Sequence, residues 1–329
     1  MFELTLVIII IALLFDFLNG MNDAANSIAT IVATRVLTPK LAVAWAAFFN
    51  FAAAFGFGVH VARTIGKGIV ETNVVDQYLI LSALIGAVIW THGCTQFGLP
   101  ISVSHSLIGG LAGAAIIKAG FASLVPSGLI KVTIFIFLSP IIGLVLGAVL
   151  MILVTWIFRK SNNRKVDKFF KAGQLLSSAA FSLGHGTNDA QKTMGIISIL
   201  LFTNGYLGSE FYVPFWVIII SHTAIGLGTL SGGWKVIRTM GMKLTHLKPV
   251  GGFCAETAGA TVLIFTALAG IPVSTTHTIT GSIMGVGMIK RLTAVKWGVA
   301  GKIVWAWILT IPLSGLIGAL VYLVMKQFL

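Results

Sequence analysis

Long apolar stretches recur along the whole chain, separated by short polar segments. They cover residues 4–18, 41–58, 78–90, 132–158, 212–230, 252–269 and 303–325. Several approach or exceed the roughly 20 residues that an α-helix needs to cross the hydrocarbon core of a bilayer. The runs at 4–14 and 145–158 do not alternate between apolar and polar positions, as the strands of a transmembrane β-barrel do. The pattern predicts an all-α polytopic membrane protein.

The composition agrees with this prediction. Hydrophobic residues make up 57% of the 329 residues, charged residues only 9%, and the mean hydropathy is +0.99. Soluble domains carry about 25% charged residues, so this chain has too few to cover a surface that faces only water. The 37 glycines suit membrane helices that approach closely or are interrupted. The first apolar run has no basic stretch before it, and we expect a retained helix there, not a signal peptide.

The net charge of +13 does not indicate a nucleic-acid-binding protein. The basic residues lie in short loops between the apolar stretches, which is typical of cytoplasmic loops that face anionic lipid. We therefore expect a multi-pass protein of the cell membrane (plasma or inner membrane), with the lipid bilayer as a partner and no nucleic acid.

Two motifs occur twice, in the same order. Gly-Met-Asn-Asp-Ala-Ala-Asn-Ser at 20–27 recurs 166 positions later as Gly-Thr-Asn-Asp-Ala-Gln-Lys-Thr at 186–193. Gly-Leu-Pro-Ile-Ser-Val-Ser-His-Ser at 98–106 recurs 172 positions later as Gly-Ile-Pro-Val-Ser-Thr-Thr-His-Thr at 270–278. The similar offsets indicate one repeated unit.

The repeat divides the chain into a first transmembrane repeat at 1–158, a basic cytoplasmic linker at 159–171 and a second repeat at 172–329. Loop charges predict that the two repeats have inverted topology. Loop 59–76 carries two bases and two acids, whereas its counterpart 232–251 carries four bases and no acid. Basic loops face the cytoplasm, so the two loops are expected on opposite sides. Loops 118–131 and 290–302 are both basic and do not discriminate, and the number of crossings within 77–158 stays open.

The Asn-Asp motif places one carboxylate in an apolar helix of each repeat. Ionisable residues inside a membrane usually face a cavity and mark an ion pathway. Carboxylate and amide oxygens suit a small cation such as Na+, and a carboxylate can instead carry a proton. The glycines before each motif permit a broken helix at this point, whose freed carbonyls could join the coordination. An alternative is an Asp-Asn pair that only caps a helix.

Residues predicted to bind or couple the cation are Asn22, Asp23, Asn26, Asn188, Asp189, Gln191 and Glu256, with Na+ itself expected at Asp23, Asn26 and Asp189. Glu256 is included because it is a lone acid in an apolar segment and occurs in one repeat only. Lys192 replaces Asn26 in the second motif, and we expect it to form an ion pair with Asp189, with attraction of the anion as the alternative. Asp16, in the first apolar helix, is expected only to face a polar neighbour.

The Pro-containing motif predicts a re-entrant hairpin in each repeat. Pro100 and Pro272 prevent a continuous helix, and hydroxyl and imidazole groups follow at once. A helix that begins just after the proline directs its N–H groups at the cavity, which makes an anion site. The alternative is that these are small polar residues that join membrane helices. The predicted anion-binding residues are Ser102, Ser104, His105, Ser274, Thr275, Thr276 and His277.

Both pairs of motifs resemble the duplicated signature of the PiT family of inorganic phosphate transporters, over essentially the full length of the chain. The resemblance implies an inverted-repeat fold and symport of phosphate with Na+ or H+, at a site formed by hairpin hydroxyls and motif carboxylates. The short linker is similar to that of prokaryotic members. The family also contains sulfate permeases, so sulfate transport is the alternative function. Inorganic phosphate and the coupling cation are the expected ligands, no cofactor is expected, and a homodimer is left open.

Two other functions fit less well. An intramembrane hydrolase could use Ser102 or Ser104 with His105, but no nucleophile elbow is present, and we expect no enzymatic activity. A channel would not need buried acids beside an anion site. We therefore expect a secondary transporter that alternates access to a site near the bilayer midplane.

Overall fold

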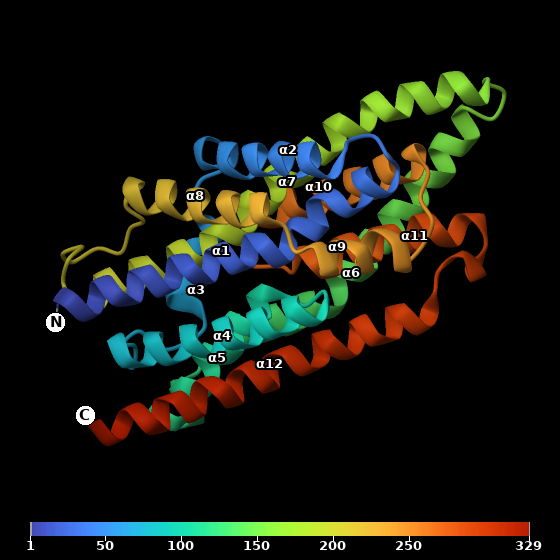
Figure 1. Ribbon diagram of the computed structural model, residues 1–329. Coiled ribbons are helices and arrows are strands. Elements are labelled where there is room, and N and C mark those ends of the chain that lie inside the picture. Colours follow the sequence, from blue (N-terminus) through green and yellow to red (C-terminus); the bar gives the residue numbers. More distant parts are fainter. Residues whose placement is uncertain (1, 329) are drawn as a thin grey trace.

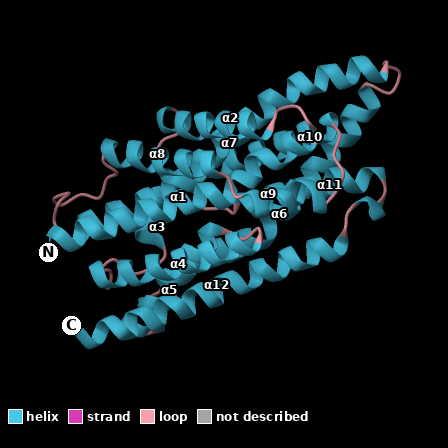
Figure 2. Ribbon diagram, in the orientation of Figure 1, coloured by secondary structure: helices cyan, strands magenta, loops and turns pink. Residues whose placement is uncertain are grey.

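The computed structural model describes residues 2–328, and this part of the chain is helical, with no strand beyond an isolated bridge between Val70 and Leu124 (Figure 2). Six α-helices lie in each half. The first half holds α1 (Phe2–Ala33), α2 (Pro39–Ala52), α3 (His60–Gly68), α4 (Gln77–Phe97), α5 (Val103–Ala119) and α6 (Pro126–Ile157). The second holds α7 (Asn163–Thr203), α8 (Phe215–Ser231), α9 (Trp234–Arg238), α10 (Pro249–Leu268), α11 (Thr275–Lys290) and α12 (Trp297–Met325).

The two halves run in opposite directions, as the loop charges predict. In Figure 1, α1 starts at the end of the molecule that holds both termini, whereas α7 starts at the opposite end, beside the α6–α7 connection. The same inversion relates α6 to α12. Only the first residues of the predicted linker form a loop. Helix α7 begins at Asn163, so residues 163–171 are its first turns.

Each half contains one bent helix pair and one hairpin. Helix α2 and its 3-10 extension to Phe55 meet α3 at 81°, and α8 meets the α9 segment at 63°. Segments 59–76 and 232–251, predicted as loops, therefore contain the short second arms of bent pairs. Among the described residues, five helices are long and apolar enough to cross a membrane, or up to seven if each bent pair forms one span. Helices α4–α5 and α10–α11 form the two hairpins, which turn in the middle of the molecule (Figure 1).

The halves are intertwined instead of lying side by side. Helix α5 packs along α12, α11 packs along α6, and α1 and α7 pack against α8 and α2, respectively. Glycines allow this close approach. A Cβ at Gly113 of α5 would collide with the backbone carbonyl of Gly315 in α12, and one at Gly285 of α11 would collide with that of Leu144 in α6. These equivalent contacts hold each hairpin against the long last helix of the other half.

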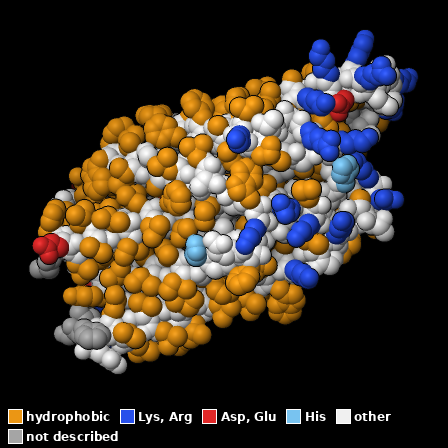
Figure 3. All heavy atoms as spheres, viewed as in Figure 1, with side chains coloured by type: hydrophobic (Ala, Val, Ile, Leu, Met, Phe, Trp, Pro, Cys, Tyr) orange, Lys and Arg blue, Asp and Glu red, His pale blue; other side chains and the backbone are white. Residues whose placement is uncertain are grey.

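The outer surface is apolar over most of the visible face, and Lys and Arg gather at the end that holds the α6–α7 connection (Figure 3). Helices α6 and α12 contribute many exposed aliphatic and aromatic side chains, including Phe137, Ile141, Leu316 and Leu320. An exposed surface this apolar is stable in lipid and not in water. The protein is therefore a multi-pass membrane protein with one basic end.

Candidate functional site

The turns of the two hairpins meet in the interior. The Thr276 hydroxyl, at the start of α11, donates a hydrogen bond to the Ile101 carbonyl in the other hairpin turn (2.9 Å). The imidazoles of His105 and His277 lie edge to face, with ring centroids 4.9 Å apart, and His277 stacks on Trp307 of α12. The predicted anion-binding residues are all at most 4% exposed, so this meeting point is closed to solvent in the present conformation.

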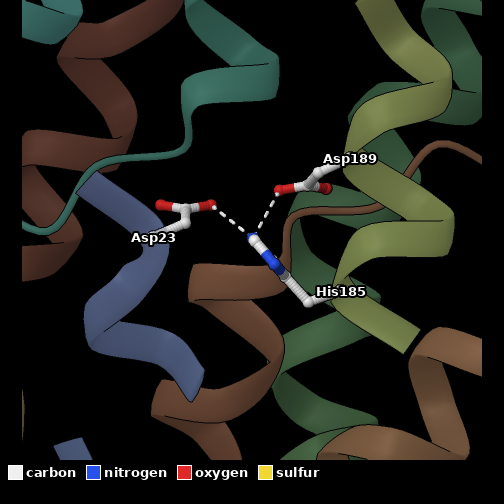
Figure 4. A group of neighbouring side chains, drawn as sticks. All are labelled: Asp23, His185 and Asp189. Carbon is white, nitrogen blue, oxygen red and sulfur yellow. Dashed lines mark ion pairs between the residues drawn. The ribbon is translucent and has the colours of Figure 1, made fainter. Parts of the chain in front are cut away.

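The two Asn-Asp motifs converge on the same place. Figure 4 shows the His185 imidazole pointing between the carboxylates of Asp23 (α1) and Asp189 (α7). His185 Nε2 lies 3.8 Å from Asp23 Oδ2 and 3.3 Å from Asp189 Oδ2. One donor atom from each of these residues lies within 4.8 Å of the others, and this group could hold a metal ion. The structure therefore brings the two predicted carboxylates together, although they are far apart in sequence.

Hairpin hydroxyls bridge the carboxylates. The Thr275 hydroxyl lies 2.9 Å from Asp23 Oδ2 and 3.1 Å from Asp189 Oδ2, and because it has one hydrogen it can donate to only one at a time. Asn26 Nδ2 donates to Thr276 Oγ1 (2.9 Å), and Thr276 Oγ1 also lies 3.3 Å from Asp23 Oδ1. The α10–α11 hairpin is thus bound directly to the motif of the first repeat.

Lys192 joins α7 to both hairpins, and it forms the predicted ion pair with Asp189. Its ammonium donates to Asp189 Oδ1 (2.5 Å), to the Ser104 hydroxyl and to the Val273 carbonyl (2.9 Å). The three N–H donors of an ammonium group match these three acceptors. Lys192 therefore places a buried positive charge between the two hairpin turns.

His185 faces acceptors at both ring nitrogens. Its Nδ1 lies 3.0 Å from Asn50 Oδ1 in α2, and Asn50 Nδ2 donates to Thr229, which identifies Oδ1 as the acceptor. Its Nε2 faces the two carboxylates. A doubly protonated imidazolium, which donates from both nitrogens, fits this position. Two carboxylates then face two positive charges, His185 and Lys192, so the cluster is neutral.

The starts of α5 and α11 place further groups that could bind an anion beside Lys192. Ser102 and Ser274 are the N-cap residues, and their hydroxyl oxygens accept hydrogen bonds from the backbone N–H groups of His105 (3.3 Å) and His277 (3.2 Å). The first N–H groups of a helix have no partner within it and carry partial positive charge. Because the two helix starts face each other beside Lys192, an anion held between them would meet positive groups from both repeats.

Of the other four predicted cation-site residues, three make hydrogen bonds away from the two carboxylates and one has no hydrogen-bond partner. Gln191 Oε1 accepts from the Val61 and Ala62 amides at the start of α3 (2.8 and 3.2 Å). Asn22 donates to Thr95 in α4 (2.7 Å). Asn188 is buried, and its side-chain polar atoms have no hydrogen-bond partner.

The fourth, Glu256, forms a separate polar cluster between α1, α7 and α10. Its carboxylate accepts from Thr30 (2.5 Å), Ser177 (2.5 Å) and Gln174 (3.0 Å). It is fully buried, and it contacts α1 at Thr30, about two helical turns after Asp23.

The prediction of a broken helix at the Asn-Asp motifs is wrong. Helices α1 and α7 continue through both motifs, so no backbone carbonyls are freed there. The motif glycines serve packing instead. A Cβ at Gly20 would collide with the Ile225 carbonyl of α8, and one at Gly186 would lie 2.5 Å from the Asn50 carbonyl of α2. The breaks in this fold lie in the bent pairs.

The sequence interpretation missed His185. This residue lies four positions before Asp189 on α7, so the two side chains share one helix face. That spacing could have identified the contact with Asp189. The contact with Asp23 depends on how α1 crosses α7, which the spacing does not give.

Comparisons with known proteins agree on one family. The sequence model described as the phosphate transporter family matches residues 19–165 and 158–318. A protein of Rhizobium meliloti (strain 1021), named "probable low-affinity inorganic phosphate transporter", is 56% identical over 321 residues, which cover 98% of this chain and 96% of that protein. A protein of the same name from Bacillus subtilis (strain 168) is 44% identical over 326 residues, covering 98% of each chain.

Among solved structures, one described as "the sodium-dependent phosphate transporter" superposes with a TM-score of 0.91 at 28% identity, covering 99% of this chain and all of that one. The fold, the duplicated motifs and these relatives lead to one conclusion. The chain belongs to the phosphate transporter family.

Proposed function

We propose that this protein imports inorganic phosphate across the cell membrane by symport with a cation, with Na+ as the coupling ion. The observation that carries the proposal is the convergence of four motifs from inverted repeats on Asp23 and Asp189 in the closed interior. Phosphate binds between the hairpin turns, and the cation binds at the carboxylates beside them.

The anion side rests on the groups at the two helix starts. Phosphate offers several acceptor oxygens, and the Ser104 hydroxyl, which accepts from Lys192, can donate its hydrogen to one of them. The Thr275 and Thr276 hydroxyls, which donate to a carboxylate and to the Ile101 carbonyl in the closed site, would turn to phosphate. Lys192 adds a charge-assisted donor, which makes stronger hydrogen bonds than a neutral group does. His105 and His277 close the site on the side of α12.

The cation side rests on charge balance. An anion is costly inside a membrane, and here two carboxylates lie next to its proposed site. The cluster of these carboxylates with His185 and Lys192 is neutral, so a bound phosphate would give the site a net negative charge. A cation at Asp23, Asn26 and Asp189 would offset that charge, so anion and cation would favour each other's binding. The structural relative described as sodium-dependent favours Na+ over H+.

Alternating access follows from the inverted repeats. Each hairpin is held against the long last helix of the other half, so each moving unit would combine a hairpin of one repeat with the last helix of the other, and the central site lies between the two units. The closed site described above corresponds to a state between outward-open and inward-open conformations.

The decisive experiment is uptake of radiolabelled phosphate into proteoliposomes that contain the purified protein. Inward Na+ and H+ gradients are imposed separately, and excess sulfate is added as competitor. We expect accumulation under the Na+ gradient and little inhibition by sulfate. Phosphate equilibration without accumulation under either gradient would contradict symport, and accumulation under the H+ gradient alone would contradict Na+ coupling.

A further inference from the structure

A second group of buried oxygen atoms lies outside the site described above. The Asp16 carboxylate on α1 is fully buried, and Asn19 and Thr193 are its polar neighbours. Both carboxylate oxygens, the Asn19 amide oxygen and the Thr193 hydroxyl lack a hydrogen bond of ordinary geometry. The Thr193 hydroxyl and the Asn19 amide group carry hydrogens and lie near the Asp16 carboxylate, but neither makes a hydrogen bond of ordinary geometry with it. The carboxylate and amide oxygens are therefore left without a donor in ordinary hydrogen-bond geometry, and oxygen ligands of this kind suit a small cation.

The position of Asp16 relates it to the other buried acids. Asp16, Asp23 and Thr30 are spaced seven residues apart on α1, which places them on one helix face about 10 Å apart. Thr30 donates to Glu256. Buried carboxylates therefore occur at three heights along α1: Asp16, then the Asp23–Asp189 pair, then Glu256 beside Thr30. On α7, which runs the opposite way, Thr193 follows Asp189 by one turn and so lies on the same side as Asp16.

Comparison of the two repeats shows that this cluster has no equivalent at the matching positions of the other repeat. The positions equivalent to Asp16, Asn19 and Thr193 in the other repeat are Ser182, His185 and Ser27. The Asp16 carboxylate therefore has no equivalent in the other repeat, and it lies between the central site and the end of the molecule that holds both termini. A buried acid is costly in a membrane, and Asp16 makes no ion pair with the nearby His185, so its presence points to a role in the ion path.

We propose that Asp16, Asn19 and Thr193 form an additional Na+ site on the terminal side of the central site, from which the coupling cation passes to Asp23 and Asp189. This inference rests on the proposed Na+-coupled function. The oxygen-only donor set distinguishes this site from the central one, where His185 lies between the carboxylates. The cation would reach it before the substrate site opens fully, because it lies about two helical turns closer to the membrane surface.

The test compares Asp16→Asn and Thr193→Val with the wild type in proteoliposomes, with Ser182→Ala as matched control at the equivalent position. Phosphate uptake is measured against external Na+, and binding of radiolabelled Na+ is measured on the detergent-purified protein. We expect Asp16→Asn to raise the half-saturating Na+ concentration at least about tenfold and Thr193→Val about fivefold, each with the phosphate KM at saturating Na+ within about twofold of wild type. Purified Asp16→Asn should also bind less Na+, and Ser182→Ala should leave both measurements unchanged.

The outcomes separate the two proposals. If the wild type accumulates phosphate with Na+ but Thr193→Val and folded Asp16→Asn show unchanged Na+ dependence, this site is refuted and the proposed function stands. An equal effect of Ser182→Ala would also refute it, because the effect would then not depend on the one-sided carboxylate. If the wild type shows no Na+-driven uptake, the proposed Na+ coupling itself fails.

Discussion

Replacing Lys192 by methionine tests the electrostatic design of the central site. Methionine keeps an unbranched side chain of similar length but removes the ammonium group. The change deletes the donors to Asp189, Ser104 and Val273 together, and it leaves a buried carboxylate with one positive neighbour fewer. We expect Lys192→Met to destabilise the protein and to weaken phosphate binding.

The size of the effect follows from the contacts that remain. Removing one partner of a buried ion pair costs about 3–5 kcal/mol, because the other charge stays buried without compensation. Asp189 still faces His185 at 3.3 Å and the Thr275 hydroxyl at 3.1 Å. The lower end, about 3 kcal/mol, is therefore expected for the free energy of unfolding.

A double-mutant cycle with Asp189→Asn separates charge from packing. If the cost comes from the unpaired carboxylate, neutralising Asp189 in the Lys192→Met background should recover about 2 kcal/mol of the loss. Unfolding is followed by tryptophan fluorescence in mixed detergent micelles, and the phosphate KM is measured in proteoliposomes. Additive effects of the two substitutions, or a Lys192→Met protein as stable as wild type, would refute the reasoning.

Three further predictions address the substrate, the cation and the topology. Asp23→Asn should abolish gradient-driven phosphate uptake while the protein still inserts and folds, since the amide cannot balance a cation; normal uptake would rule out Asp23 as a coupling residue. Thr276→Ala should raise the phosphate KM about tenfold through loss of one hydroxyl donor, measured at equal protein amounts, and an unchanged KM would remove this hydroxyl from the anion site. In a cysteine-free background, an impermeant thiol reagent added to intact cells should label Lys67→Cys but not Lys243→Cys, because the basic end is expected in the cytoplasm. Labelling of both would contradict inverted insertion of the repeats.

Much of the architecture could be predicted from the sequence because the chain carries its pattern twice. Two motifs in the same order and loop charges of opposite distribution indicate inverted repeats, and the prolines before the Ser/Thr-His segments indicate hairpin turns. The Lys192–Asp189 ion pair could also be predicted, since three residues separate the two on one helix and their charges are opposite.

The remaining features depend on packing between distant helices. Gln191 follows Asp189 by two positions and so points to a different neighbour, the start of α3, a helix that the hydrophobic pattern did not predict. Glu256 is distant from the central carboxylates because α10 packs along α7 in a register that brings it to Thr30 and Ser177. The glycines of the Asn-Asp motifs permit both a helix break and a close helix contact, and only the position of α8 and α2 distinguishes the two.

The intertwined packing also bears on how the protein is made. Ribosomes release the chain from its N-terminus, so the first hairpin, α4–α5, enters the membrane long before α12 has been synthesised. Yet α12 is the helix that covers the Gly113 side of α5, and its Trp307 donates to the Pro100 carbonyl in the first hairpin turn (3.1 Å). The α4–α5 hairpin therefore cannot complete its packing until α12 has been synthesised and inserted. A chain truncated before α12 would leave the Gly113 side of α5 and the Pro100 carbonyl without their packing partners.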